Sequence, residues 1–126
     1  MIVDDSLMNQ LLLSIVAKSM RCNIFIAHNG KEAVEQSMSV KYDLIFMDID
    51  MPILKGDEVT SMIRQKGNLN IDTPIILQSS SINKDILFNK IDGFTEKISK
   101  PYVLSQIENI ISKYTSENDF TLPINC

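Results

Sequence analysis

Hydrophobic and polar residues alternate along the chain with two different periods. Short apolar runs without polar interruption are typical of strands that are buried on both faces of a sheet. Such runs lie at residues 1–3, 24–26, 44–47 and 75–77, with a weaker one at 94–98. Between them, apolar residues recur every three or four positions, as they do on one face of a helix. These helical patterns lie at residues 8–20, 33–38, 59–63, 82–88 and 103–114.

The alternation of strands and helices predicts the fold class. Strands separated by helices of this length require right-handed crossovers and a parallel sheet covered on both faces. We therefore expect an α/β protein with a doubly wound, five-stranded parallel sheet and five helices. In such sheets the binding crevice lies beyond the carboxyl ends of the strands. Polar residues that directly follow the strands are therefore the candidates for a functional site.

The length and composition fit one domain. A chain of 126 residues, 44% hydrophobic and 22% charged, can bury one core but has no room for a second. We expect residues 1–115 to form this domain. Residues 116–126 lose the periodic pattern and are predicted to form a flexible tail.

Charge and cysteine usage restrict the partners and the compartment. The net charge of −4 disfavours a nucleic-acid surface, which needs clustered cations. No apolar run approaches the roughly 20 residues that cross a bilayer, so we expect no membrane contact. Two acidic residues follow Met1 closely where a secretory signal would be basic, which favours the cytoplasm. Cys22 and Cys126 suggest reduced thiols rather than a disulfide framework.

Five polar residues follow four of the predicted strands. Asp4 and Asp5 follow the first strand, Asp48 the third, Ser79 the fourth and Lys100 the fifth. Two carboxylates about 5 Å apart repel by roughly 3 kcal/mol at an effective dielectric constant of about 20, so three together call for a cation. Mg²⁺ suits such a site because it prefers carboxylates, waters and phosphate oxygens. A carboxylate nucleophile with an amine and a hydroxyl nearby predicts an aspartyl-phosphate site.

Each of these residues also has a simpler interpretation. Asp4 and Asp5 could cap the first helix, although Ser6 could do so equally well. Asp48 could begin a turn, and Ser79 and Lys100 could be ordinary surface residues. Their convergence at one edge of one sheet favours a site over coincidence.

In this combination and order, the residues resemble the receiver domain of two-component response regulators, in particular the receivers of hybrid histidine kinases. The resemblance covers about residues 2–114 and implies a flavodoxin-like receiver fold. It rests on Val3-Asp4-Asp5-Ser6, Ala27-His28-Asn29-Gly30-Lys31-Glu32-Ala33, Asp43 to Pro52 with Gly56 and Glu58, Ser79, and Lys100-Pro101.

The resemblance implies a role for each acidic residue of the site. Asp48 matches the phosphoacceptor, whose carboxylate attacks the phosphorus of a phosphohistidine. Asp4 and Asp5 match the acidic pair that holds Mg²⁺ together with Asp48. The backbone carbonyl of Asp50 is implied as a further metal ligand.

The resemblance also assigns the residues that contact the phosphoryl group. Ser79 matches the hydroxyl residue that moves to the phosphoryl oxygen, and Lys100 matches the lysine that pairs with it. Pro101 matches a proline that is often preceded by a cis peptide bond in the family. Lys97 departs from the pattern because it stands where receivers usually carry an aromatic switch residue, so we expect a different output or simply an exposed edge position.

The first predicted helix has more apolar residues than one buried face needs. Leu7 and Leu11 fall on a different face from the predicted core stripe, which includes Met8 and Ile15. Surplus apolar surface often marks an interface. The resemblance implies that Leu7, Leu11 and Pro101 contact a histidine kinase or a histidine phosphotransfer protein.

These observations predict a phosphoacceptor signalling module that is not an enzyme, apart from catalysing its own phosphorylation and dephosphorylation. Two alternatives remain open. A pseudo-receiver would keep the fold and only bind partners, and Lys97 is its main support. A phosphatase of the haloacid-dehalogenase type is suggested by Asp48-Ile49-Asp50. In those phosphatases, however, the motif lies on the first strand and the other metal-binding acids follow it, whereas here Asp4 and Asp5 precede it.

Overall fold

The computed structural model describes residues 1–79, 92–115 and 124–126. Its helices are α1 (Leu7–Ser19), α2 (Gly30–Ser39), α3 (Gly56–Ile63) and α5 (Leu104–Thr115). Its strands are β1 (Ile2–Val3), β2 (Cys22–Asn23), β3 (Ile26–Ala27), β4 (Ile45–Asp48), β5 (Ile75–Ser79), β6 (Glu96–Ser99) and β7 (Ile124–Asn125). The helix predicted at residues 82–88 lies outside the described residues.

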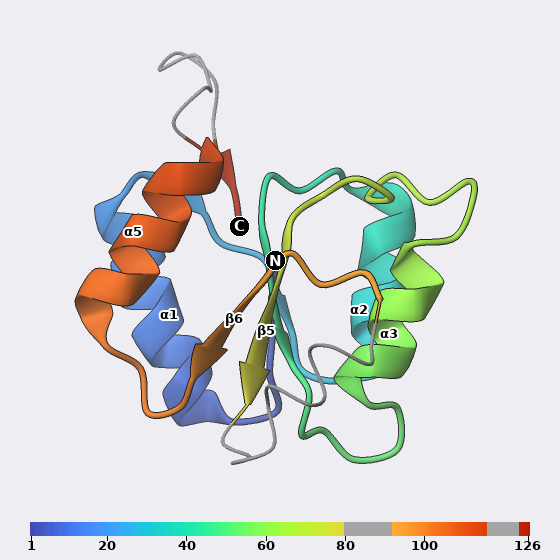
Figure 1. Cartoon of the computed structure of the whole chain (residues 1–126), viewed down its shortest axis with the longest axis horizontal. Helices are drawn as coiled ribbons and strands as arrows, with labels where there is room; N and C mark the ends of the chain where they lie inside the picture. The colour runs from blue at the N-terminus through green and yellow to red at the C-terminus, as the bar shows by residue number, and fades with distance from the viewer. Residues whose placement is uncertain (80–91, 116–123) are drawn as a thin grey trace.

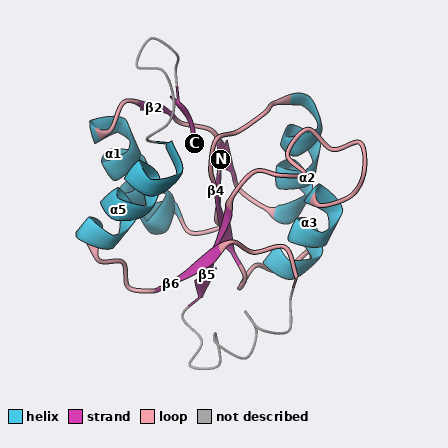
Figure 2. Ribbon diagram, turned by 45° about the horizontal axis from the view of Figure 1, so that its top comes forward, coloured by secondary structure: helices cyan, strands magenta, loops and turns pink. Residues whose placement is uncertain are grey.

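Five of these strands form one parallel sheet in the order β3-β1-β4-β5-β6. Figure 1 shows the sheet nearly edge-on, with α1 and α5 against one face and α2 and α3 against the other. The predicted doubly wound, flavodoxin-like sheet is therefore confirmed. All five strands are parallel, so the residues that follow them meet at one edge of the sheet. The arrows of β5 and β6 in Figure 2 point toward this edge.

The strands carry apolar side chains on both faces because both faces are covered. Alternate residues of a strand point to opposite sides of a sheet. Ile2, Phe46 and Ile76 pack with α1 and α5, whereas Val3 and Met47 pack with α2 and α3. The uninterrupted apolar runs of the sequence therefore correspond to two cores separated by one sheet.

The buried face of α1 differs from the prediction. Met8 and Ile15 were expected in the core stripe, but they are 76% and 57% exposed. Val16, which belongs to the same predicted stripe, is buried as expected, and Leu13 and Ala17 are buried beside it and face the sheet and α5. Apolar residues occur all around this helix, so periodicity alone could not select the face, and packing against the neighbouring elements decides it.

A second, two-stranded sheet was not predicted. β7 pairs in parallel with β2, and the N–H of Cys126 donates to the carbonyl of Asn23 at 2.9 Å. Cys126 is buried, and its Sγ lies 3.1 Å from that of Cys22, both as free thiols. The segment expected to be a flexible tail thus ends in a strand that is packed on the domain. Among the described helices, none is long and apolar enough to span a membrane.

Candidate functional site

The turn between β1 and α1 holds Asp4 inside the protein. The N–H of Ser6 donates to Asp4 Oδ1 at 2.9 Å, and Gln10 Nε2 donates to the Asp4 carbonyl at 2.6 Å. Ser6 is also the N-cap of α1, because its hydroxyl accepts from the N–H of Asn9. Capping is therefore done by Ser6, and Asp4 is fully buried while Asp5 is exposed.

Asp48 is the last residue of β4 and is almost fully buried. The N–H of Asp50 donates to Asp48 Oδ1 at 3.0 Å, which fixes the carboxylate at the end of the strand. The start of α3 passes very close to it, because a Cβ on Gly56 would lie 2.3 Å from the carbonyl oxygen of Asp48. Glycine is required here by this close approach to the backbone.

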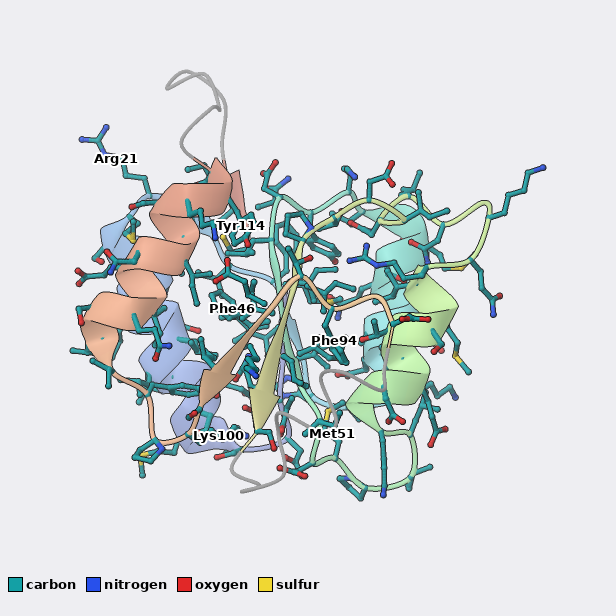
Figure 3. The ribbon with its side chains drawn as sticks, in the orientation of Figure 1. Arg21, Phe46, Met51, Phe94, Lys100 and Tyr114 are labelled. Atoms are coloured by element: carbon teal, nitrogen blue, oxygen red, sulfur yellow. The ribbon has the colours of Figure 1, made fainter. Side chains whose placement is uncertain are left out.

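Lys100 and Ser79 reach the same edge from the neighbouring strands. Ser79 ends β5 and is buried, and the N–H of Lys100 donates to its carbonyl at 3.1 Å. The Lys100–Pro101 peptide bond is cis, as the resemblance implied. Lys100 Nζ lies 3.0 Å from Asp48 Oδ1 and 3.6 Å from Asp4 Oδ2. Figure 3 shows Lys100 at the tip of its strand.

Three carboxylates meet at this edge. Asp4, Asp5 and Asp48 each offer an oxygen, and these oxygens lie within 4.8 Å of one another. Burial raises the pKa of Asp4, and the charge of Asp48 raises it further, while the Ser6 N–H and Lys100 act against the shift. Lys100 therefore offsets only part of the cost of collecting the carboxylates.

The donor set fits a hard divalent cation. Asp4 Oδ2 is buried and accepts no hydrogen bond from the described residues. Oxygen atoms of carboxylates are the ligands that Mg²⁺ prefers, and a cation would relieve the repulsion that Lys100 leaves. Asp50 lies next to these groups through its hydrogen bond to Asp48, although its carbonyl as a metal ligand stays a prediction.

Two polar residues beside the acidic cluster were missed in the sequence. The hydroxyl of Tyr102 donates to Oε1 of Gln78, and Gln78 is fully buried in β5. The signal was present, because Gln78 directly follows the apolar run 75–77 and Tyr102 directly follows Lys100-Pro101. Lys97, in contrast, lies half-buried on β6, which is one of the two edge strands of the described sheet, beside residues of α5.

The residues expected to contact a partner lie at the surface near the site. Leu7 and Leu11 are 75% and 60% exposed, and Pro101 is exposed. The turns that carry Leu7 and Pro101 are adjacent, because Lys100 Nζ and Asp4 Oδ2 lie 3.6 Å apart. Since Met8 and Ile15 are exposed as well, the apolar surface of α1 is larger than predicted.

Comparisons with known sequences show the family. A sequence model of the family "Response regulator receiver domain" matches residues 1–112. The chain is 33% identical to Hybrid signal transduction histidine kinase G of Dictyostelium discoideum, over 90% of this chain and 3% of that protein. It is 28% identical to Transcription factor SKN7 of Saccharomyces cerevisiae, over 93% of this chain and 18% of that protein. Among the first curated relatives, the chain spans between 3% and 20% of their lengths.

Solved structures show the same fold. The response regulator protein TrrA from Thermotoga maritima, in complex with Mg(2+)-BeF, superposes with a TM-score of 0.77 at 29% identity, over 90% of this chain and 95% of that chain. The receiver domain of sensor histidine kinase PA1611 from Pseudomonas aeruginosa, with a magnesium ion in its active site cleft, superposes with a TM-score of 0.79 at 22% identity, over 92% and 97%.

This chain belongs to the response regulator receiver domain family. Receiver domains of this kind are phosphorylated by histidine kinases or phosphotransfer proteins, and the chain is accordingly a phosphoacceptor module of two-component and phosphorelay signalling.

Proposed function

We propose that Asp48 accepts the phosphoryl group from the phosphohistidine of a histidine kinase or a histidine phosphotransfer protein. The observation that carries this proposal is the pairing of Lys100 Nζ with Asp48 Oδ1 at 3.0 Å inside a cluster of three carboxylates. A buried carboxylate held by an ammonium group at a strand end is positioned to act as a nucleophile, and it has a cation ready for the incoming charge.

The transfer uses the residues of the site in distinct roles. An oxygen of Asp48 attacks the phosphorus, the bond from phosphorus to the histidine nitrogen breaks, and an acyl phosphate forms while the nitrogen keeps the electron pair. Lys100 Nζ, which contacts the Asp48 carboxylate before the transfer, then also pairs with a phosphoryl oxygen. Ser79, buried at the end of β5, donates its hydroxyl to another phosphoryl oxygen.

The acidic cluster is the proposed Mg²⁺ site. Asp4, Asp5, Asp48 and the backbone carbonyl of Asp50 would hold the ion, in part through water. When bound, Mg²⁺ supplies positive charge that neutralises the carboxylates and the incoming phosphoryl oxygens. The magnesium complexes of TrrA and of the PA1611 receiver domain support this assignment.

The test is the intact mass of the protein after incubation with a small phosphoramidate donor, which replaces the kinase. We expect one phosphoryl group to be added in the presence of Mg²⁺ and none after its removal. Asp48→Asn should abolish the addition without unfolding the domain, whereas Asp72→Asn, a matched change at an exposed aspartate, should not alter it. A folded wild-type protein that gains no phosphoryl group would favour the binding-only pseudo-receiver instead.

Partner contact is proposed for the apolar surface formed by Leu7, Leu11 and Pro101. The occupant is the helical domain that carries the phosphohistidine, because this surface adjoins the site and a donor histidine must approach Asp48 from there. Leu11→Glu should slow transfer from a phosphorylated partner and leave labelling by phosphoramidate unchanged. Met38→Glu is a matched control, because Met38 is also 60% exposed but lies on α2. Equal slowing by both variants would contradict this surface.

The remaining parts of the proposal concern the reactions that the domain catalyses, its contact with nucleic acids and its location in the cell. The domain acts on no other substrate and catalyses only its own phosphorylation and its dephosphorylation by water. The net charge of −4 supports the absence of direct nucleic-acid contact. Two free buried thiols, Cys22 and Cys126, support a reducing, cytoplasmic location.

A further inference from the structure

A buried polar pair that the proposed phosphoryl transfer does not use lies beside the acidic cluster. The hydroxyl of Tyr102 donates to Oε1 of Gln78. Gln78 is fully buried in a strand whose preceding residues, 75–77, are all apolar, and Tyr102 is half-buried directly after the Lys100–Pro101 peptide bond. Burying an amide costs free energy unless its polar atoms are paired, so the pair needs an explanation.

Two buried atoms of this region lack a hydrogen bond to any described residue, although Lys100 Nζ forms an ion pair with one of them, Asp4 Oδ2, at 3.6 Å. Gln78 Nε2 is a buried donor, and Asp4 Oδ2 is a buried acceptor, and neither makes a hydrogen bond within the described part of the chain. The Tyr102 hydroxyl bonds to Gln78, and the pKa of Tyr102 is raised by burial first and then by the charges of Asp4 and Asp48, which places the hydroxyl close to both carboxylates.

One rearrangement satisfies both atoms. A side-chain amide has nearly the same shape after a half-turn about its last bond, which exchanges its donor and its acceptor. Gln78 Nε2 then donates to the oxygen of Tyr102, and the single proton of the Tyr102 hydroxyl becomes available for Asp4 Oδ2. A hydroxyl can accept one hydrogen bond while it donates another, so the chain of bonds from Gln78 to Asp4 is continuous, and Gln78 Oε1 then occupies the position that Nε2 held.

We propose that Gln78 and Tyr102 form a hydrogen-bond relay, from Gln78 Nε2 through the Tyr102 hydroxyl to Asp4 Oδ2, that positions the Asp4 carboxylate for Mg²⁺. The inference rests on the proposed function, because it assigns to this pair the orientation of one of the proposed metal ligands. Both are positioning residues, since they act through Asp4. Hydrogen bonds that orient a ligand typically change metal affinity by 10- to 100-fold when they are removed.

The test is the dissociation constant of Mg²⁺, measured by calorimetric titration of the metal-free protein with magnesium chloride. Tyr102→Phe removes only the hydroxyl, and we expect it to weaken Mg²⁺ binding about tenfold. Gln78→Leu should weaken it to a similar extent, and the double variant should bind no more weakly than either single variant, because both substitutions break one relay. Two independent packing effects would add instead.

A matched control is Tyr42→Phe. Tyr42 also donates its hydroxyl to a glutamine, Gln36 at 3.4 Å, but it precedes β4, at the end of the sheet opposite to Asp48. This variant should leave the Mg²⁺ dissociation constant unchanged. Thermal unfolding of each variant measures any loss of stability separately from the change in Mg²⁺ affinity. A loss of stability is compatible with the relay in all three single variants, but weaker Mg²⁺ binding is expected only for Tyr102→Phe and Gln78→Leu.

A second readout does not depend on any substitution. In the metal-free wild-type protein, the Nε2 protons of Gln78 should exchange slowly with water in nitrogen-15 spectra, because a buried and bonded amide is protected. Fast exchange of these protons would overturn the relay. If the wild-type protein and Tyr102→Phe bind Mg²⁺ equally well, the relay is overturned and the proposed metal site stands. If the wild-type protein binds no Mg²⁺, the proposed metal site is overturned together with the relay.

Discussion

Ile53 lies in the loop between β4 and α3 with a backbone φ of +69°, in the left-handed region. This conformation costs an L-residue roughly 1–2 kcal/mol, and a β-branched side chain is among the least suited to it. The side chain is fully exposed, with a relative exposure of 102%, so it buries no surface in return. A residue that tolerates positive φ should therefore stabilise the domain without a loss of packing.

We expect Ile53→Asn to raise the free energy of unfolding by about 1 kcal/mol, since asparagine accepts the left-handed region more readily. For a domain of this size, that gain corresponds to a rise in Tm of about 3–5 °C. Ile53→Gly should gain less, because glycine also adds roughly 0.4–1 kcal/mol of conformational freedom to the unfolded chain. Ile53→Val keeps the β-branched side chain and should change nothing.

Urea unfolding followed by circular dichroism measures these differences, with thermal scans as a second determination. Phosphoramidate labelling of Asp48 verifies that each variant keeps an intact site. The reasoning would be refuted if Ile53→Asn were no more stable than Ile53→Val. A gain in both variants would instead mean that the isoleucine side chain, rather than the backbone conformation, is unfavourable at this position.

Three further predictions concern the acidic edge. Gly56→Ala should lower both the urea midpoint and the rate of labelling, because its Cβ would lie 2.3 Å from the Asp48 carbonyl and must displace that residue. Lys100→Met should cost about 3 kcal/mol in urea unfolding of the metal-free protein, since it leaves two buried carboxylates without their cation. Burial raises the pKa of Asp4, so the folded state holds this proton more tightly than the unfolded chain does. The metal-free protein should therefore lose stability as the pH rises from about 4 through the folded-state pKa, and urea midpoints measured against pH should show that Asp4→Asn removes this loss.

The sheet could be predicted from the sequence because a strand covered on both faces leaves an unbroken apolar run, as at residues 44–47 and 75–77. The convergence of Asp4, Asp48 and Lys100 followed from topology alone, since parallel strands end at one edge. The roles of these residues in phosphoryl transfer remain the proposal made above.

Other features depend on contacts between distant segments and could not be predicted. The exposure of Met8 and Ile15 reflects how α1 packs on α5 and the sheet, which its own apolar pattern does not determine. The positive φ of Ile53 runs against the preference of its residue type, so no local signal indicates it. The pairing of Gln78 with Tyr102 joins the end of β5 to the loop between β6 and α5, and the distance between them becomes known only once the fold is built.

The pairing of β2 with β7 leaves the acidic edge of the sheet uncovered by the last described residues. It brings the last residues beside the start of the sheet, where the amino group of Met1 donates to the carbonyl of Leu44 at 2.7 Å. Figure 2 shows the two ends close together, away from the tips of the strands. The segments around Met1 and Asn125 therefore lie on the side opposite to Asp48, and neither stands in the path of a phosphorylated histidine that approaches that residue.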